Sequence, residues 1–370
     1  MKKLKVIVSG GGTGGHIFPA VSIANELKER LPETEILFVG ALGKMEMERV
    51  PAAGYQIIGL PVMGFPRKLS FKIFSFLLKL YQSMRMARKV VQDFKPDVAI
   101  GVGGFASGPV LKAAARKGIP TVLQEQNSYA GVTNKLLSAN VSKICVAYPN
   151  MNQYFPAEKI VMTGNPIRKN LTEAVVNKSE ALKFFSLNAF HPVVLIVGGS
   201  LGARTLNESV MANLELIEKT DVQIIWQTGS FYYKEMMERL GKFVPENLRP
   251  MEFVSRMDLA YAAADVVISR AGAGTISELC LLGKPSILVP SPNVAEDHQT
   301  KNAMALVENK AAMLIKDVNS KEQLIKETFS LLQDKERLNS LAENSLKLGR
   351  PNAAKDIVDV ILEVVEKAKS

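Results

Sequence analysis

Two segments of this chain share one local pattern, in which a short apolar strand leads through a glycine-rich loop into a helix. The first has a strand at residues 4–9 and glycines within residues 10–15, and the second has a strand at residues 193–197 and glycines within residues 198–202. Apolar residues at helical spacing follow each loop. This arrangement is typical of nucleotide-binding α/β units. In a chain of 370 residues it predicts two domains of that kind.

Short apolar strands alternate with helical stretches in both halves, as in parallel sheets covered on both faces. The sequence therefore predicts an α/β fold of two Rossmann-like domains that face each other across a cleft, with ligands at the carboxyl ends of the strands. We expect one domain at residues 1–163, a second at 164–350, and a C-terminal helix in 351–370 that can return to the first. Further strands are expected at 35–39, 98–102, 121–124, 144–146, 222–227, 251–254, 266–269, 286–289 and 312–315.

Charge and residue usage narrow the choice of partners. The formal net charge of +10 favours an anionic partner, such as nucleic acid, phosphate groups or an acidic membrane surface. Nucleic acid is not expected, because the chain carries no nucleic-acid motif. Two cysteines without a C-x-x-C, and only three histidines, argue against a disulfide scaffold and against a metal site.

The first glycine loop also satisfies G-x-G-x-x-G through Gly10, Gly12 and Gly15. An NAD-dependent oxidoreductase would carry an acidic residue at the end of the second strand, and none stands there. Neither loop leads into Gly-Lys-Ser/Thr, which disfavours a P-loop ATPase. Glycines that only permit a tight turn remain an alternative for either loop.

The most informative segment is residues 269–278, which follow an apolar strand and precede a helix. The backbone N–H groups of Gly274, Thr275 and Ile276 would open that helix and could bind a diphosphate. Glu278 lies about one turn further along, where its carboxylate could accept hydrogen bonds from a ribose diol. The alternative is a capping box from Thr275 to Glu278, and the two interpretations are compatible.

Seven motifs, in order along nearly the whole chain, resemble those of the MurG family of peptidoglycan enzymes within glycosyltransferase family 28. One such motif alone would be weak, but seven in register are highly specific. The motifs are Gly11-Gly-Thr-Gly-Gly-His-Ile-Phe-Pro19, Gly103-Gly-Phe-Ala-Ser-Gly-Pro109, Glu125-Gln-Asn127 with Gly131 and Asn134, Gly164-Asn-Pro-Ile-Arg168, Gly198-Gly-Ser-Leu-Gly-Ala203, Arg270-Ala-Gly-Ala-Gly-Thr-Ile-Ser-Glu278 and Asp297-His-Gln-Thr-Lys-Asn-Ala303.

The resemblance implies an inverting glycosyltransferase of the two-domain GT-B type. It would move N-acetylglucosamine from UDP-N-acetylglucosamine to the C4 hydroxyl of undecaprenyl-diphosphate-MurNAc-pentapeptide, which converts lipid I into lipid II in peptidoglycan biosynthesis. The donor would bind mainly to the second domain and the acceptor to the first. No metal or other cofactor is expected, because helix N-termini and loop amides can stabilise the leaving diphosphate. A UDP-sugar epimerase of the same fold is the main alternative, and a non-catalytic nucleotide-sugar sensor is another.

Inverting transfer needs a base for the acceptor hydroxyl, and a histidine suits this role near pH 7. His16 follows the first glycine loop, and the alternative is that it only caps its helix. Glu125 is a competing base, and its alternative role is to orient Asn127.

The resemblance also carries over donor-binding residues. The first loop would contact the sugar and the diphosphate, and two amide side chains would contact the sugar hydroxyls. The second loop and residues 273–276 would bind the diphosphate. One carboxylate would bind the ribose, and one backbone position would contact the uracil. Arg168 matches a donor-site arginine of unassigned role. In chain order the donor-binding set is Thr13, Gly14, Gly15, Asn127, Arg168, Ser200, Val254, Ala273, Gly274, Thr275, Ile276, Ser277, Glu278 and Gln299.

Residues 67–89 contain seven basic residues and no acidic one, interleaved with aromatic and aliphatic side chains. Such a segment suits the surface of an anionic bilayer, whereas the alternative is a helix packed on the sheet with solvated lysines. No apolar run approaches the ~20 residues that cross a bilayer, and the stretch after the basic N-terminus is too short for a signal peptide. We therefore expect an unprocessed, peripheral protein at the cytoplasmic face of the inner membrane.

Overall fold

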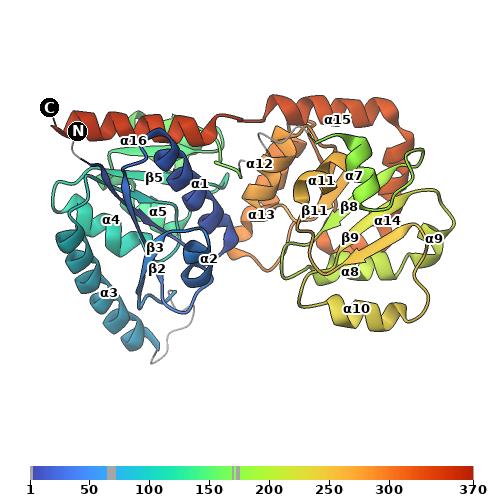
Figure 1. Ribbon diagram of the computed structural model, residues 1–370, viewed down its shortest axis with the longest axis horizontal. Helices are drawn as coiled ribbons and strands as arrows, with labels where there is room; N and C mark the ends of the chain where they lie inside the picture. The colour runs from blue at the N-terminus through green and yellow to red at the C-terminus, as the bar shows by residue number, and fades with distance from the viewer. Residues whose placement is uncertain (1–2, 65–71, 169–170, 172–175, 370) are drawn as a thin grey trace. The chain divides into compact units, whose positions relative to one another are not determined.

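The computed structural model describes residues 3–64, 72–168, 171 and 176–369. They form two compact units, one made of Met1–Arg168 with Asn352–Ser370 and the other of Lys169–Pro351 (Figure 1). The expected boundary between residues 163 and 164 falls inside the first unit, and the last helix belongs to that unit as well.

The first unit is built on a seven-stranded parallel sheet of order β3-β2-β1-β4-β5-β6-β7. Its strands are β1 (Lys5–Ser9), β2 (Glu35–Ala41), β3 (Gln56–Leu60), β4 (Val98–Gly101), β5 (Thr121–Glu125), β6 (Lys143–Val146) and β7 (Ile160–Met162). Its α-helices are α1 (Gly14–Arg30), α2 (Glu46–Ala52), α3 (Lys72–Phe94), α4 (Ser107–Ala115), α5 (Val132–Leu137) and α16 (Ala353–Lys369).

The second unit is built on a six-stranded parallel sheet of order β10-β9-β8-β11-β12-β13. Its strands are β8 (Val193–Val197), β9 (Gln223–Gln227), β10 (Leu248–Met251), β11 (Val266–Ser269), β12 (Ser286–Leu288) and β13 (Met313–Leu314). Its α-helices include α7 (Lys178–Phe184), α8 (Arg204–Met211), α9 (Leu214–Glu218), α10 (Tyr233–Leu240), α11 (Met257–Ala263), α12 (Ala273–Leu281), α13 (His298–Val307), α14 (Ser320–Gln333) and α15 (Lys335–Lys347).

Both sheets therefore have the strand order of a Rossmann fold, with the order reversing between β1 and β4 in one unit and between β8 and β11 in the other. This confirms the predicted α/β class and the two Rossmann-like domains. The glycine loops follow β1 and β8, so each lies at the carboxyl end of a strand beside the reversal point. Ligands of open α/β sheets bind at that position.

Helices pack against both faces of the first sheet (Figure 1), and apolar side chains fill the space between them. On one face, α1 and α16 pack together on the strands, and α16 contributes Ile357, Ile361 and Val364 to that core. Arg30 of α1 also forms a 2.7 Å ion pair with Asp359 of α16. On the other face, α3 and α4 contribute Ala87, Val91 and Leu111 among others. These apolar contacts explain why the last helix belongs to the first unit.

Several predicted elements are corrected by the structure. Strands β3 and β7 were not expected from the sequence, and β10 ends at Met251, where a strand over residues 251–254 was expected. Helix α1 begins at Gly14 with Thr13 as its N-cap, so it starts within the first glycine loop and not after it. Helix α12 begins at Ala273 with Gly272 as its N-cap. Thr275 therefore lies inside the first turn, and the capping-box interpretation is wrong.

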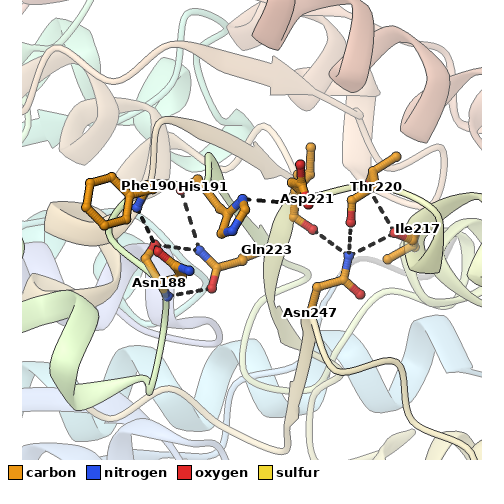
Figure 2. Close-up of polar contacts among 9 residues, drawn as sticks. Asn188, Phe190, His191, Ile217, Thr220, Asp221, Gln223 and Asn247 are labelled. Atoms are coloured by element: carbon orange, nitrogen blue, oxygen red, sulfur yellow. Dashed lines mark hydrogen bonds and ion pairs between the residues drawn. The ribbon is translucent and has the colours of Figure 1, made fainter.

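Polar side chains bind the loops at the amino edge of the second sheet (Figure 2). Gln223 of β9 accepts from the Asn188 N–H at 2.7 Å and donates to the Asn188 carbonyl at 2.9 Å. Asn247 donates to three carbonyls within residues 217–222. These contacts lie at the end of the strands opposite to the glycine loops, so they stabilise the unit away from the candidate site.

Within the described ranges, no helix is both long and apolar enough to span a bilayer.

Candidate functional site

The glycine loop after β1 packs against two other segments of the first unit. A Cβ on Gly11 would lie 2.2 Å from a carboxylate oxygen of Glu46, and Gly11 has a φ of +146°. A Cβ on Gly104, in the loop after β4, would lie 2.4 Å from the Gly11 carbonyl oxygen. Only glycine fits at these two positions, because any side chain would push the loops apart. The two glycine motifs of the first half therefore meet at the reversal point of the sheet.

Glu46 of α2 supports this loop from within the protein, and no motif in the sequence pointed to it. The residue is 1% exposed. Its Oε2 accepts from the Gly12 N–H at 2.8 Å, and its Oε1 accepts from the Ala41 N–H at 2.9 Å. Both carboxylate oxygens are thus hydrogen-bonded to backbone amides, which fixes the position of the loop relative to the end of β2.

His16 is half-buried in the first turn of α1. Its Nδ1 lies 3.1 Å from the Gly11 carbonyl oxygen and 3.3 Å from the Thr13 hydroxyl. A carbonyl can only accept, so Nδ1 carries the proton and Nε2 carries the lone pair of the neutral ring. Nε2 faces the loop after β4, since a Cβ on Gly103 would lie 2.8 Å from it. The two groups that Nδ1 contacts belong to residues before the helix, which disfavours the alternative in which His16 only caps α1.

Glu125, the competing base, is bound within its own loop. It is 2% exposed at the end of β5. Oε1 accepts from the Asn127 N–H at 3.1 Å and from the Asn127 side chain at 3.3 Å. Oε2 accepts from the Gly131 N–H at 3.0 Å and from the Asn134 side chain at 2.8 Å. With four donors on its carboxylate, the residue fits the alternative role of orienting Asn127 better than that of a base.

Asn165 connects the Gly164–Arg168 motif to the loop after β5. Its side chain accepts from Gln124 at 2.9 Å and donates to the Gln126 carbonyl at 2.9 Å. Three residues further on, the Arg168 guanidinium lies over the Phe18 ring of α1, 5.6 Å from its centroid. The structure thus places Arg168 beside α1, where the residue that it contacts lies two positions after His16.

In the second unit, the loops after β8 and β9 approach backbone to backbone. A Cβ on Gly202 would lie 2.1 Å from the Thr228 carbonyl oxygen, and one on Gly229 would lie 2.1 Å from the Gly202 nitrogen. The Ser230 N–H donates to the Ser200 carbonyl at 3.0 Å. Ser200, the candidate diphosphate ligand, is therefore held through its carbonyl, and its side chain is exposed.

Gln227, at the end of β9, joins this loop to the candidate uracil contact. Its Nε2 donates to the Gly199 carbonyl at 2.9 Å, and its Oε1 accepts from the Val254 N–H at 2.8 Å. Gln227 is almost fully buried. Because the Val254 N–H is engaged, a backbone contact from Val254 to a base would use its carbonyl oxygen. No motif in the sequence indicated Gln227.

Helix α12 opens with Gly272 in an extended conformation and without a side-chain cap. The first-turn amides of residues 273–275 are therefore available to an anion. Arg270, just before the helix, donates to the Val289 carbonyl at 3.0 Å and pairs with Asp317. This pairing holds the loop after β11 in place.

One turn into α12, Glu278 is held from the neighbouring helix α11. The Tyr261 hydroxyl donates to its Oε2 at 2.8 Å. Ser277 donates back to the Ala273 carbonyl at 2.9 Å, within the helix. Gln299, in the first turn of α13, accepts from the Ser291 N–H at 2.9 Å. The second unit therefore contains Ser200, Val254, residues 273–278 and Gln299.

The first unit contains the remaining predicted residues, which are Thr13, Gly14, Gly15, His16, Glu125, Asn127 and Arg168. Thr13, Gly14 and Gly15 form the N-cap and first two residues of α1, where backbone amides lack helical partners. Among the residues that the structure describes, no group of three or more His, Cys, Asp or Glu side chains gathers as a metal site.

Two family models match this chain. The glycosyltransferase family 28 N-terminal domain matches residues 6–146, and the glycosyltransferase family 28 C-terminal domain matches residues 193–359. A UDP-N-acetylglucosamine–N-acetylmuramyl-(pentapeptide) pyrophosphoryl-undecaprenol N-acetylglucosamine transferase of Parabacteroides distasonis is 54% identical over 367 residues, which cover 99% of this chain and 100% of that protein. A protein of the same name from Cytophaga hutchinsonii is 51% identical, over 98% of both chains.

Solved structures show the same architecture. The crystal structure of Acinetobacter baumannii MurG matches with a TM-score of 0.79 at 29% identity, covering 97% of this chain and 99% of that one. A UDP-GlcNAc 2-epimerase from Neisseria meningitidis bound to UDP-GlcNAc matches with a TM-score of 0.66 at 17% identity, covering 98% of this chain and 100% of that one. At that lower identity the likeness concerns the fold alone.

Proposed function

Because this chain belongs to glycosyltransferase family 28, we propose that it transfers N-acetylglucosamine from UDP-N-acetylglucosamine to undecaprenyl-pyrophosphoryl-N-acetylmuramyl-pentapeptide. The C4 hydroxyl oxygen of the acceptor forms a bond to C1 of the donor sugar. The bond from C1 to the diphosphate oxygen breaks, and its electron pair leaves with UDP. The proton of the hydroxyl passes to a base of the protein. The product is the β-1,4-linked disaccharide of lipid II.

One observation carries this proposal: the carboxyl edges of the two sheets hold different chemistry. The edge of the first sheet has an imidazole whose Nδ1 is bound to the Gly11 carbonyl. The edge of the second has the N-terminus of α12, which has no side-chain cap, and a carboxylate held by Tyr261. An imidazole suits proton removal, and a helix N-terminus suits a leaving diphosphate. The first unit thus has a group suited to deprotonating the acceptor, and the second has a group suited to binding the leaving diphosphate.

We assign the donor to the second unit. The first-turn amides of α12 and the loop bearing Ser200 bind the diphosphate, and Glu278 accepts hydrogen bonds from the ribose. The Val254 carbonyl accepts from the uracil N3–H, because its own N–H is held by Gln227. Gln299 contacts a sugar hydroxyl. Each role is supported by position at the carboxyl edge of the sheet and by a neighbouring hydrogen bond that fixes the group.

We assign proton removal to Nε2 of His16 in the first unit. Its tautomer is set by the Gly11 carbonyl, so the lone pair lies on the nitrogen opposite to the fixed one. Glu125 orients Asn127, which contacts the sugar. Uptake of the proton turns the ring into an imidazolium, and the first unit returns that proton to water after the product leaves.

We also propose that the first unit binds the cytoplasmic face of the inner membrane through α3. The second half of this helix is anchored in the core by Ala87 and Val91. Its first half presents large apolar side chains to solvent, of which Phe74 is 77% and Tyr81 67% exposed. Arg85 continues the same helical face at i+4 from Tyr81 and is exposed. Residues 65–71, including Lys68, lie outside the described residues.

A transfer assay tests the proposed function. The protein is incubated with UDP-N-acetylglucosamine and a short-chain lipid analogue of the acceptor, and UDP and disaccharide are quantified together. We expect the two products in equal amounts, and no UDP without acceptor. Release of UDP without disaccharide, or conversion of the donor to its C2 epimer, would overturn the proposal.

A further inference from the structure

A single peptide group connects Glu46 to His16. Its N–H belongs to Gly12 and donates to Oε2 of Glu46 at 2.8 Å. Its carbonyl belongs to Gly11 and lies 3.1 Å from Nδ1 of His16, which donates to it. The peptide is planar and rigid, so its two hydrogen bonds point in opposite directions. A carboxylate, an amide and an imidazole thus form one continuous chain of hydrogen bonds.

The carboxylate end of this chain is built into the fold. Oε1 of Glu46 accepts from the Ala41 N–H at 2.9 Å, at the end of β2. Glycine is required on both sides: a Cβ on Gly11 would lie 2.2 Å from Oε1, and one on Gly40 would lie 2.6 Å from Cγ of Glu46. The side chain is 1% exposed, so water does not compete for these bonds. Such a fixed, buried carboxylate acts on its neighbours more strongly than a solvated one.

We propose that Glu46 is a positioning residue for His16 and acts through the Gly11–Gly12 peptide. A carboxylate that accepts the amide N–H draws electron density toward the amide oxygen, which makes the Gly11 carbonyl a stronger acceptor. The stronger acceptor favours the ring form with its proton on Nδ1. It also stabilises the imidazolium that forms when Nε2 takes the acceptor proton. A carboxylate does the same when it binds a catalytic imidazole directly. The inference rests on the proposed function, in which His16 is the base.

The charged side chains to consider around this chain of hydrogen bonds are those of Glu46, Arg168 and Glu125. Glu46 from α2 supplies the negative charge, and Arg168 lies over the Phe18 ring two residues along α1 from His16. Glu125 of β5 is bound to four donors of its own loop. From the loop after β4, the facing group is the uncharged backbone of Gly103. Through the Gly11–Gly12 peptide, Glu46 is thus connected to the ring by hydrogen bonds.

A double-mutant cycle separates this role from simple support of the loop. We expect His16→Ala to lower kcat by ~10²–10⁴-fold and Glu46→Gln to lower it by about ten- to a hundredfold, as for residues that orient a functional imidazole. In the His16→Ala background, Glu46→Gln should lower kcat by less than about twofold more, because the imidazole on which Glu46 acts is gone.

The KM for UDP-N-acetylglucosamine should stay within about twofold of wild type in all of these variants. The acidic limb of the kcat profile should move to lower pH in Glu46→Gln, since the imidazolium loses its stabilising charge.

Glu26→Gln is the matched control. Glu26 is another buried glutamate, on α1 itself, three turns beyond His16. Whatever its effect on the melting temperature, the Glu26→Gln variant should keep the wild-type kcat and pH profile. Equal losses from Glu46→Gln in the wild-type and His16→Ala backgrounds would overturn the proposal. If the wild-type protein itself forms no disaccharide, the proposed function fails instead, so the two failures are distinguishable.

A measurement on the wild-type protein keeps the test independent of how the variants fold. The chain has three histidines, so the ¹⁵N resonances of the His16 ring can be assigned by substituting the other two. We expect the neutral ring to be protonated at Nδ1. A neutral ring protonated at Nε2 would overturn the proposal.

Discussion

The hydroxyl of Tyr261 on α11 donates a 2.8 Å hydrogen bond to Oε2 of Glu278 on α12. Tyr261 is 1% exposed, so the bond forms away from bulk water and fixes the carboxylate rotamer. A carboxylate held in advance loses less entropy when it binds a ribose diol. The pair therefore links the packing of two helices to affinity for the donor.

Replacing Glu278 by alanine should weaken UDP binding by roughly 1.5–3 kcal/mol, which is about tenfold or more in affinity. Tyr261→Phe keeps the ring in the core and removes only the hydroxyl, so we expect a smaller loss, of about two- to fivefold. Calorimetric titration with UDP measures both. Unchanged affinity in Glu278→Ala would remove Glu278 from the donor site.

Gln227 should govern both affinity and base preference. Gln227→Leu frees the Val254 N–H and the Gly199 carbonyl, and we expect UDP affinity to fall about tenfold. The preference for UDP over CDP should also shrink, because the Val254 carbonyl favours the N3–H of uracil over the N3 lone pair of cytosine. Gln223→Leu is the matched control: this buried glutamine lies at the other end of β9 and binds Asn188 (Figure 2). The Gln223→Leu variant should be less stable but should keep the wild-type ratio of UDP affinity to CDP affinity. Equal affinity ratios in the Gln227→Leu and Gln223→Leu variants would contradict the assignment.

Lys284 should make the stability of the second unit depend on pH. Burial lowers the pKa of its ammonium group to about 8, while Asp265 acts in the opposite direction. The unfolded chain, with a pKa near 10.5, binds more protons between pH 8 and 10.5, so this residue adds stability as the pH rises through that range. The Lys284→Met variant lacks this ammonium group, so its stability does not change with pH for this reason. The melting temperature of the wild type should therefore rise relative to that of the variant from pH 7.5 to 10, as followed by calorimetry; a constant difference would contradict this.

Membrane binding should depend on the exposed face of α3. Replacing Phe74 and Leu78 by serine should reduce binding to vesicles that contain anionic lipids. Replacing Arg85, Arg88 and Lys89 by glutamine should weaken it further and lower its salt dependence, at ~1 kcal/mol per charge. UDP affinity should not change, because the donor is assigned to the other unit. Co-sedimentation over a range of ionic strength measures the effect, and equal binding to neutral and anionic vesicles would exclude electrostatic docking.

The sequence was sufficient to predict those parts of the fold that local patterns determine. Apolar strands and glycine loops gave the two Rossmann-like units. Strand β10 was misplaced because Pro250 lies within it, and a proline suggests that a strand has not yet begun. The structure places β10 at the edge of the sheet, where a proline is tolerated. Strand β7 was missed because it is only three residues long, and β3 was missed because it contains a glycine.

The supporting residues of the candidate site were harder to predict than the residues they support. His16 and Glu278 lie in motifs, one after a glycine loop and the other near a helix start, so local sequence and resemblance both pointed to them. Glu46 is distant in sequence from the Gly12 amide that it holds, and Gln227 is distant from the Gly199 carbonyl and the Val254 amide. Nothing in the residues around them marks a buried carboxylate or amide. Their roles depend on which loops meet at the sheet edge, and tertiary packing decides that.

The central claim is that His16 removes the acceptor proton while the second unit binds the donor. It is tested most directly by measuring disaccharide formation by His16→Ala at saturating donor and acceptor, together with its UDP affinity. We predict that turnover falls by ~10²–10⁴-fold and that UDP affinity stays within about twofold of wild type. Wild-type turnover in this variant would contradict the claim.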